Sequence, residues 1–247
     1  MGRAAHNRYH SHMRSTIALA LLFVAAVSSA QEKEPINPDR PGIADGSQTV
    51  GPGVFQVELG GERDRFADSR EWSTPLLLRY GVGAPFELRV ESAGFTSNGW
   101  APPSMGFKYH FLDKPSLGII ARYFPPFRSQ RSSADLRLAA DINLDKDEKW
   151  ALNPNIGVST QDDGDGRFTA ALAALTLQYN VTKTFNVFVD GGLQAPESRG
   201  GSSSLILDTG AAWILGNDTQ LDVEAGWGAH GQTPPNAFIG AGISRRF

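Results

Sequence analysis

The sequence of 247 residues contains no cysteine. A disulfide framework and a thiolate metal site are therefore both excluded. A lipid anchor placed directly after an export signal is excluded too, because that modification needs a cysteine at the cleavage point. Histidine is almost as scarce, since only His110 and His230 lie beyond the first 30 residues. We find no catalytic constellation in the sequence and expect no cofactor.

Long apolar runs are missing as well. The most apolar stretch, STIALALLFVAAV at residues 15–27, is too short to span a bilayer comfortably as a helix. Three arginines precede this stretch and small residues follow it at 28–30, which is the pattern of an export signal cleaved before Gln31. The start is either Met1 or Met13, because the shorter version is a complete signal by itself.

Basic side chains are in the minority. Removal of residues 1–30 takes away three of the 23 basic residues and none of the 26 acidic ones. The mature chain then has 20 basic against 26 acidic residues, which gives a net charge of −6. Proteins that bind nucleic acid carry basic patches or stripes, so nucleic acid is not an expected partner.

Apolar and polar residues alternate through the rest of the chain, in stretches of eight to eleven residues separated by turn-forming residues. In PFELRVES, for example, Phe86 and Leu88 share one face, and Glu87 and Arg89 share the other. We count twelve such stretches and predict a β-strand for each of them, at residues 53–62, 72–80, 85–92, 104–111, 116–124, 134–142, 150–159, 168–179, 184–191, 204–214, 219–228 and 237–247. The predicted fold class is all-β.

The connections between these strands alternate in length. Short turns such as LDKP and GNDT follow the even-numbered strands, and long loops such as AGFTSNGWAPP follow the odd-numbered ones. In an up-and-down meander, the short turns lie at one end and the long loops at the other. Together with the export signal, this predicts a transmembrane antiparallel β-barrel of about 12 strands in the bacterial outer membrane, with short periplasmic turns and longer extracellular loops. The barrel must close, because an open edge in lipid would leave backbone groups unpaired.

A soluble barrel or sandwich also has alternating strands, but its bulky apolar face points inward. In this sequence one face carries many charges that a dry core could not bury. Aromatic residues gather near the ends of the predicted strands, as they do at membrane interfaces. Both observations favour the membrane barrel, with the charged face toward the lumen.

The residues predicted to line the lumen occupy the charged, inward-facing positions of the predicted strands. They are Glu58, Arg79, Glu87, Arg89, Glu91, Lys108, His110, Arg122, Arg137, Asp190, Asp208, Asp222 and Glu224. In one interpretation, the charges pair across neighbouring strands and fill a narrow interior. In the other, they line a water-filled solute path and set its selectivity. The sequence leaves both interpretations open.

The chain ends in NAFIGAGISRRF, with an aromatic as the last residue. Chain ends of soluble proteins usually trail into water, so a terminal Phe needs a reason. In a closed barrel the last strand pairs with the first, and its apolar face presents Ile239, Ala241, Ile243 and Phe247. Phe247 is then expected in the aromatic girdle at the periplasmic interface. The ending resembles the signature that the barrel-assembly machinery reads, except that Arg245 stands where an apolar residue is usual.

Several stretches carry a resemblance to a known family. NPDRPG at 37–42, GPGVFQVELG at 51–60, LLRYGVGAPFELRVES, GFKYHF and the ending LDTGAAWILGNDTQLDVEAGWG to FIGAGISRRF resemble the MetA-pathway of phenol degradation family of outer-membrane barrel proteins. The resemblance covers nearly the whole mature chain. It implies a transporter or channel, suggested for the uptake of aromatic compounds. It brings no catalytic or binding residues that can be matched to this sequence.

We therefore predict a signal peptide over residues 1–30, a periplasmic N-terminal segment over 31–52 and an outer-membrane barrel over 53–247. The predicted function is a channel or transporter, without enzymatic activity, for small hydrophobic or aromatic solutes. Outer-membrane lipid, lipopolysaccharide and the barrel-assembly machinery are the other expected partners. The stretch EKEPINPDRPG at 32–42 fits either a periplasmic tail or a plug of the lumen.

Two other functions stand as alternatives. The first is a non-conducting structural or adhesive barrel whose lumen is sealed by its own ion pairs. The second is an outer-membrane lipid hydrolase, which would need a His on the outer face beside a Ser. The parity of His110 is inward, which disfavours the hydrolase.

Overall fold

The computed structural model describes residues 34–127, 131–196, 198–231 and 234–247. The predicted signal peptide at residues 1–30 lies outside the described residues. Pro35–Phe247 form one compact unit. Among the described residues there is no helix with the length and apolar character needed to cross a membrane.

This unit is built from antiparallel strands. They are β1 (Phe55–Arg65), β2 (Arg70–Ser73), β3 (Leu76–Gly83), β4 (Phe86–Ser92), β5 (Phe95–Thr96), β6 (Gly99–Trp100), β7 (Ser104–Asp113), β8 (Ser116–Phe124), β9 (Ser133–Asn143), β10 (Trp150–Asp162), β11 (Arg167–Thr182), β12 (Phe185–Gln194), β13 (Ser204–Leu215), β14 (Thr219–His230) and β15 (Ala237–Arg246). The short strands β2, β5 and β6 extend the long-loop end of the wall. The other strands form the wall itself.

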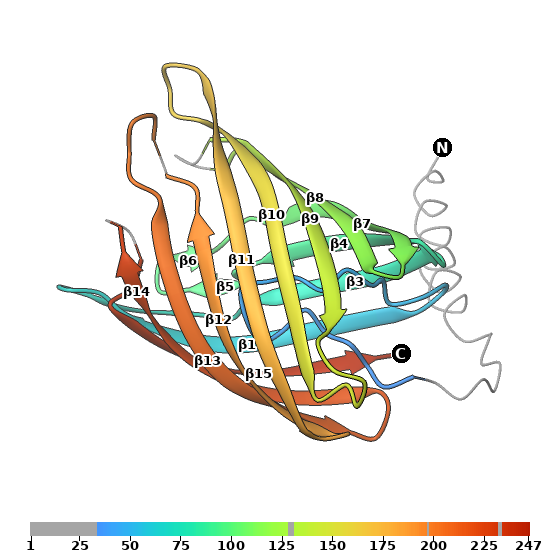
Figure 1. Cartoon of the computed structure of the whole chain (residues 1–247). Coiled ribbons are helices and arrows are strands. Elements are labelled where there is room, and N and C mark those ends of the chain that lie inside the picture. Colours follow the sequence, from blue (N-terminus) through green and yellow to red (C-terminus); the bar gives the residue numbers. More distant parts are fainter. Residues whose placement is uncertain (1–33, 128–130, 197, 232–233) are drawn as a thin grey trace, which may run out of the picture. The chain divides into compact units, whose positions relative to one another are not determined.

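Each wall strand pairs with the next one along the chain, and β15 pairs back with β1. The fold is therefore a closed antiparallel barrel of 12 strands, which confirms the predicted fold. Figure 1 shows the strands curving around a common interior, with the β10–β11 and β12–β13 connections projecting at one end. Short turns join β3 to β4, β7 to β8 and β13 to β14 at the other end.

The strand predicted at 72–80 is wrong at its beginning. The wall strand β3 begins at Leu76, and Trp72 lies in the separate short strand β2. Pro75 separates the two, because a proline has no N–H to give to a sheet. Its carbonyl still accepts a hydrogen bond from the N–H of Gly60 at 2.8 Å. The chain thus passes from the short strand β2 into the wall strand β3 at Pro75.

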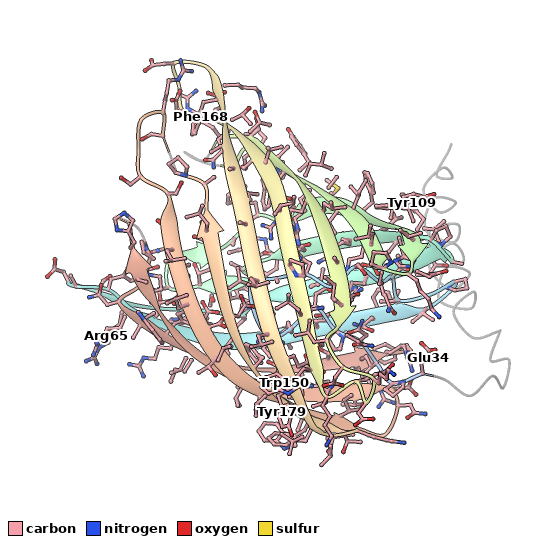
Figure 2. All side chains as sticks on the ribbon, viewed as in Figure 1. Glu34, Arg65, Tyr109, Trp150, Phe168 and Tyr179 are labelled. Atoms are coloured by element: carbon pink, nitrogen blue, oxygen red, sulfur yellow. The ribbon has the colours of Figure 1, made fainter. Side chains whose placement is uncertain are left out.

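The two faces of the wall differ as the alternation predicted. Large apolar side chains point outward and stay exposed, with 62% of Ile156 and 61% of Ile239 accessible. On the inner face, Glu58, Glu87 and Lys108 are fully buried. Aromatic residues pair near the short-turn end, where the ring centroids of Trp150 and Tyr179 are 4.6 Å apart (Figure 2). An apolar outer band with aromatic residues at its edge is the surface that lipid requires.

The last strand closes the barrel through the predicted residues. Ile243, Ala241 and Ile239 lie opposite Leu59, Gly61 and Arg63 of β1, respectively. The N–H of Phe247 donates a hydrogen bond to the carbonyl of Phe55 at 2.8 Å. The rings of these two residues are 6.3 Å apart, and the guanidinium of Arg245 lies 6.0 Å from the Phe247 ring. The terminal Phe is therefore tied into the seam. Its recognition by the assembly machinery stays a prediction.

We expect Phe247→Ala to lower the free energy of unfolding by about 0.5–1.5 kcal/mol, because the ring pair with Phe55 is lost. Urea unfolding of the refolded barrel in lipid vesicles measures this. Val181→Ala, which truncates an exposed apolar residue at the same end of β11, is the control. Equal losses in the two variants would show that the ring pair adds nothing to the seam.

Candidate functional site

The inner face of the barrel has a basic side and an acidic side. The structure places every predicted lumen residue on this inner face. The basic side is formed by Arg79, Arg89, Lys108, Arg122 and Arg137 on the consecutive wall strands β3, β4, β7, β8 and β9. The acidic side is formed by Asp190, Asp208, Asp222 and Glu224 on β12, β13 and β14. The two sides face each other across the lumen, and the basic side also carries Glu87, Glu91 and Asp135, which pair with its arginines.

The space between the two sides holds residues 35–54, which we name the lumen segment. The N–H of Ile36 donates to the carbonyl of Asn217 at 2.8 Å, and the N–H of Gly53 donates to the carbonyl of Gly81 at 2.8 Å. Both partners lie at short turns, so the segment enters and leaves at the periplasmic end and loops through the lumen between. For residues 35–52 this corrects the predicted periplasmic location. The plug, which the sequence left open, is the arrangement seen.

Asp39 of the lumen segment binds the basic side. Its carboxylate lies 2.5 Å from Arg89, 2.9 Å from Lys108 and 3.6 Å from Arg79. The N–H of Asp39 donates in turn to the Glu58 carboxylate at 3.1 Å. All of these groups are withdrawn from water. One carboxylate thus pairs with three cations, of which Arg79 and Arg89 also have wall carboxylates within ion-pair distance.

Asp45 binds the same side further along. Its carboxylate lies 2.6 Å from Arg122, 3.1 Å from Arg89 and 3.4 Å from Arg137. Asn155 holds the backbone at this point, because its side chain accepts from the N–H of Asp45 and donates to its carbonyl, both at 2.9 Å. The segment is therefore fixed through side chain and backbone together.

The acidic side receives the donors of the segment. Arg40 lies 3.2 Å from Asp222 and 3.5 Å from Glu224. The N–H of Ile43 donates to the Asp190 carboxylate at 2.8 Å. Acidic groups of the segment thus meet the basic side, and basic groups and N–H donors meet the acidic side. The opposite charges on the two sides of the lumen therefore fix the orientation of the segment between them.

Ser47 fixes the part of the segment that returns toward the short-turn end. Its hydroxyl donates to the Asp141 carboxylate at 2.6 Å and lies 2.7 Å from the Ser116 hydroxyl. The ring of His110 contacts the Ser47 carbonyl at 3.3 Å through Nδ1 and Asp113 at 2.8 Å through Nε2. His110 therefore lies in the lumen, as its parity predicted, and it serves to position the segment.

Glycines on the inner face make room for the segment. A Cβ at Gly118 of β8 would overlap the backbone of Ser47, and a Cβ at Gly192 of β12 would lie 2.5 Å from the Ile43 side chain. Because a side chain at either position would displace the segment, these glycines are part of the docking surface. Neither glycine was among the predicted lumen residues.

A wide cavity opens above the segment at the long-loop end. It has a volume of about 940 Å³, and we name it the vestibule. Its rim is rich in proline and serine, including Pro102, Pro103 and Ser132. Arg40 of the lumen segment and Glu58 of β1 line its floor. A solute from outside the cell would therefore enter a broad polar mouth and meet the docked segment below.

The ion pairs also fix how docking depends on pH. Burial alone would raise the pKa of Asp39, but Arg79, Lys108 and Arg89 outweigh it and hold the pKa well below the ordinary 3.8. Asp45 behaves alike, since Arg122 and Arg89 outweigh its burial and lower the pKa. A carboxylate with a depressed pKa stabilises the docked state above its ordinary pKa and loses that contribution as the pH falls toward the docked value.

We therefore expect docking to be unchanged between pH 7 and about pH 5 and to weaken only below the ordinary carboxylate pKa of 3.8. The measurement is bilayer conductance of the mature protein as the pH is lowered. A variant that lacks residues 35–50 is the control for direct effects of pH on the wall. An opening centred between pH 5 and 7 would show that these two carboxylates do not hold the segment.

Residues that form the lumen site were in part missed by the sequence analysis. Asp39, Arg40, Asp45, Ser47 and Asn155 were not among the predicted lumen residues. Asn155 had a usable signal, because it has inward parity on a predicted strand. The other four lie in irregular backbone, where parity gives no direction. Among the described residues, no cluster of His, Asp and Glu side chains is arranged to hold a metal ion.

The chain was compared with known proteins. The model of a family described as "Putative MetA-pathway of phenol degradation" matches residues 38–247. Among solved structures, the COG4313 outer membrane channel from Pseudomonas putida F1 is similar, with a TM-score of 0.56 and 13% identity over 86% of this chain and 100% of that chain. The NanC porin is similar too, with a TM-score of 0.52 and 11% identity over 77% and 98%. No curated protein matches the chain in sequence.

The two structures have the fold seen in this chain, which is that of bacterial outer-membrane barrels. At 13% and 11% identity, they bear on the fold alone. The family match covers every wall strand and the lumen segment from Pro38 onward. The chain therefore belongs to the MetA-pathway of phenol degradation family.

Proposed function

We propose that the protein is an outer-membrane channel for small solutes, in which the lumen segment is the barrier to passage. The observation that carries the proposal is the docking of this segment across the lumen by Asp39, Asp45 and Arg40. The segment lies below a vestibule of about 940 Å³. The similarity to an outer membrane channel and to a porin supports the same function.

The lumen segment is the part of the structure best suited to move. The wall strands are joined to their neighbours by continuous backbone ladders, and breaking a ladder in lipid would expose unpaired N–H and C=O groups. Between its two ends, which are bonded through the backbone, the segment is held by contacts with side chains of the wall, many of them ion pairs. Groups released from these contacts can be hydrated by lumen water. Displacement of the segment therefore costs less than opening the wall.

The sealed, non-conducting barrel remains the second candidate function. The observation that favours it is the mutual pairing of the lumen charges, with Arg79 lying 2.8 Å from Glu87 and 3.0 Å from Glu58. In that case the segment would fill the interior permanently, and the extracellular loops would carry the structural or adhesive function.

One experiment separates the two functions. Single-channel conductance is measured in a planar bilayer for the refolded mature chain and for a variant lacking residues 35–50, which retains Gly53 and its hydrogen bond to Gly81. Higher steady conductance in the shortened variant supports a channel with the segment as its barrier. Absence of conductance in both, with correct heat-modifiable folding, supports the sealed barrel. Equal conductance in both would keep the channel and remove the segment as its barrier.

The expected solute is small and has an aromatic or other apolar body. The family description supports this class, because it refers to phenol degradation. The lumen adds a requirement, since both of its sides are charged and a wholly apolar solute would gain nothing from them. The geometry therefore favours a solute that combines an apolar body with a polar or charged group.

A further inference from the structure

A second cavity of about 370 Å³ lies beside the lumen segment, and we name it the acidic pocket. It shares Arg40, Glu62 and Pro75 with the lining of the vestibule, so the two spaces adjoin. Its volume falls within the range of pockets that hold small organic ligands. The pocket therefore lies next to the space that a solute in the vestibule would occupy.

Strand register brings four carboxylates together around this pocket. Glu62 of β1 and Glu224 of β14 both lie opposite Gly240 of β15. Two residues away along β15, Phe238 lies opposite Asp64 of β1 on one side and Gly226 of β14 on the other. Gly226 in turn lies opposite Asp208 of β13. Gly240 and Gly226 present no side chain to the interior. The Phe238 ring covers Gly226 and the Glu224 carboxylate covers Gly240, so these glycines let both side chains pack close to the wall at the edge of the pocket.

Asp208 is the unsatisfied member of this group. Only 5% of the residue is exposed, and its Oδ1 has no hydrogen-bond partner. The residue opposite it on β12 is Asp190, a second acid. A buried carboxylate without a donor is costly, and either a proton or a bound cation relieves that cost.

Arg40 does not supply that cation. It is the only basic side chain among the described residues that line the pocket, and it is already shared between Asp222 and Glu224, at 3.2 and 3.5 Å. Acidic side chains therefore outnumber basic ones; Glu62 and Asp64 are hydrogen-bonded to each other, and Oδ1 of Asp208 is left without a partner. The pocket selects for positive charge.

The opposite part of the lining is apolar. Phe66 and Phe238 contribute rings, and Ile43, Ile206 and Pro234 contribute aliphatic surface. A bare metal ion would leave this surface unused. Among the described residues, no three acidic or histidine side chains are placed to hold a metal together. Size, lining and carboxylate geometry all favour a larger cation with an apolar body.

We propose that the acidic pocket binds an organic ammonium ion with an aromatic or aliphatic body, whose charged nitrogen lies against Asp208 and Glu62 and whose body packs on Phe66 and Phe238. The proposal rests on the proposed channel function, for which it names the solute class. In this proposal, the solute binds in the acidic pocket after it enters the vestibule and before it meets the lumen segment.

Isothermal titration calorimetry of the refolded mature chain in detergent micelles tests the pocket. The probe is 2-phenylethylamine, which is cationic at neutral pH, and 2-phenylethanol is its neutral analogue. Empty micelles provide the baseline. We expect the amine to bind at least about tenfold more tightly than the alcohol, since a hydrogen bond to a charged group carries that much free energy. Asp208→Asn and, separately, Glu62→Gln should each weaken amine binding by about tenfold and leave the alcohol unchanged.

Asp163→Asn is the matched control, because it removes the same charge from a loop residue at the vestibule that does not line the acidic pocket. Amine binding that survives both pocket substitutions, or that equals alcohol binding, would overturn the proposal. Binding of Ca²⁺ in place of the amine, with the same dependence on Asp208, would make the pocket a metal site and overturn it too. Binding without conductance in either the mature chain or the variant lacking residues 35–50 would uphold the pocket and reject the channel, and conductance without binding would do the reverse.

Discussion

Replacing Asp39 by Asn is expected to release the lumen segment and raise the conductance of the barrel. Asp39 lies within ion-pair distance of Arg79, Arg89 and Lys108, all buried on the basic side. Loss of its charge removes the anion that these three cations share, and it leaves Lys108 with no other carboxylate within ion-pair distance among the described residues. Breaking a buried ion pair from one side costs about 3–5 kcal/mol, which corresponds to a shift of at least about a hundredfold in the docking equilibrium.

Undocking can be measured directly because the chain has no cysteine. In an Ala44→Cys background, a thiol probe reports the exposure of a residue that is only 8% accessible when docked. Asp39→Asn should accelerate maleimide labelling and increase conductance together. Asp147→Asn removes the same charge from an exposed turn and should change neither. Faster labelling without greater conductance would mean that the segment leaves its contacts but is not the barrier.

The wall of the barrel could be predicted from the sequence because a strand in lipid has one apolar and one polar face. Alternation located each wall strand, and the parity of residues such as Lys108 and Glu224 gave the inner face. Errors occurred beyond the predicted strand ends and also at inward positions that were overlooked. Asp64 was assigned to a loop, although β1 continues to Arg65. Glu62 has the parity of Glu58 and was overlooked, so both missed members of the acidic pocket had a signal in the strand pattern.

The lumen segment could not be placed by the same reasoning. Its backbone is irregular, so no periodicity indicates which way Asp39 or Asp45 points. What specifies its position is charge complementarity with residues more than forty positions away, such as Arg89 and Arg122. Such pairings depend on the closed barrel that brings distant strands together. The sequence showed both sets of charges and left their partners undetermined.

Gly118→Val tests the same barrier by shape instead of charge. Gly118 lies on the inner face of β8, where a Cβ would meet the Ser47 backbone. Valine is well suited to a strand, so the wall itself should tolerate the change. The docked segment should not, because backbone cannot rotate aside as a side chain can. Crowding of this kind costs about 1–3 kcal/mol, and we expect faster maleimide labelling in the Ala44→Cys background and higher conductance.

Gly61→Val is the control, because a Cβ at Gly61 on the outer face of β1 would meet open space. Gly118→Val changes only the packing of the segment and leaves the charged residues of its ion pairs in place. Asp39→Asn removes a charge and leaves the packing at Gly118 unchanged. If both open the channel, the barrier is the seated segment, whichever interaction is removed. If only Asp39→Asn does so, the conductance responds to the unpaired cations of the basic side, and the segment would be a counter-ion to them and not a gate.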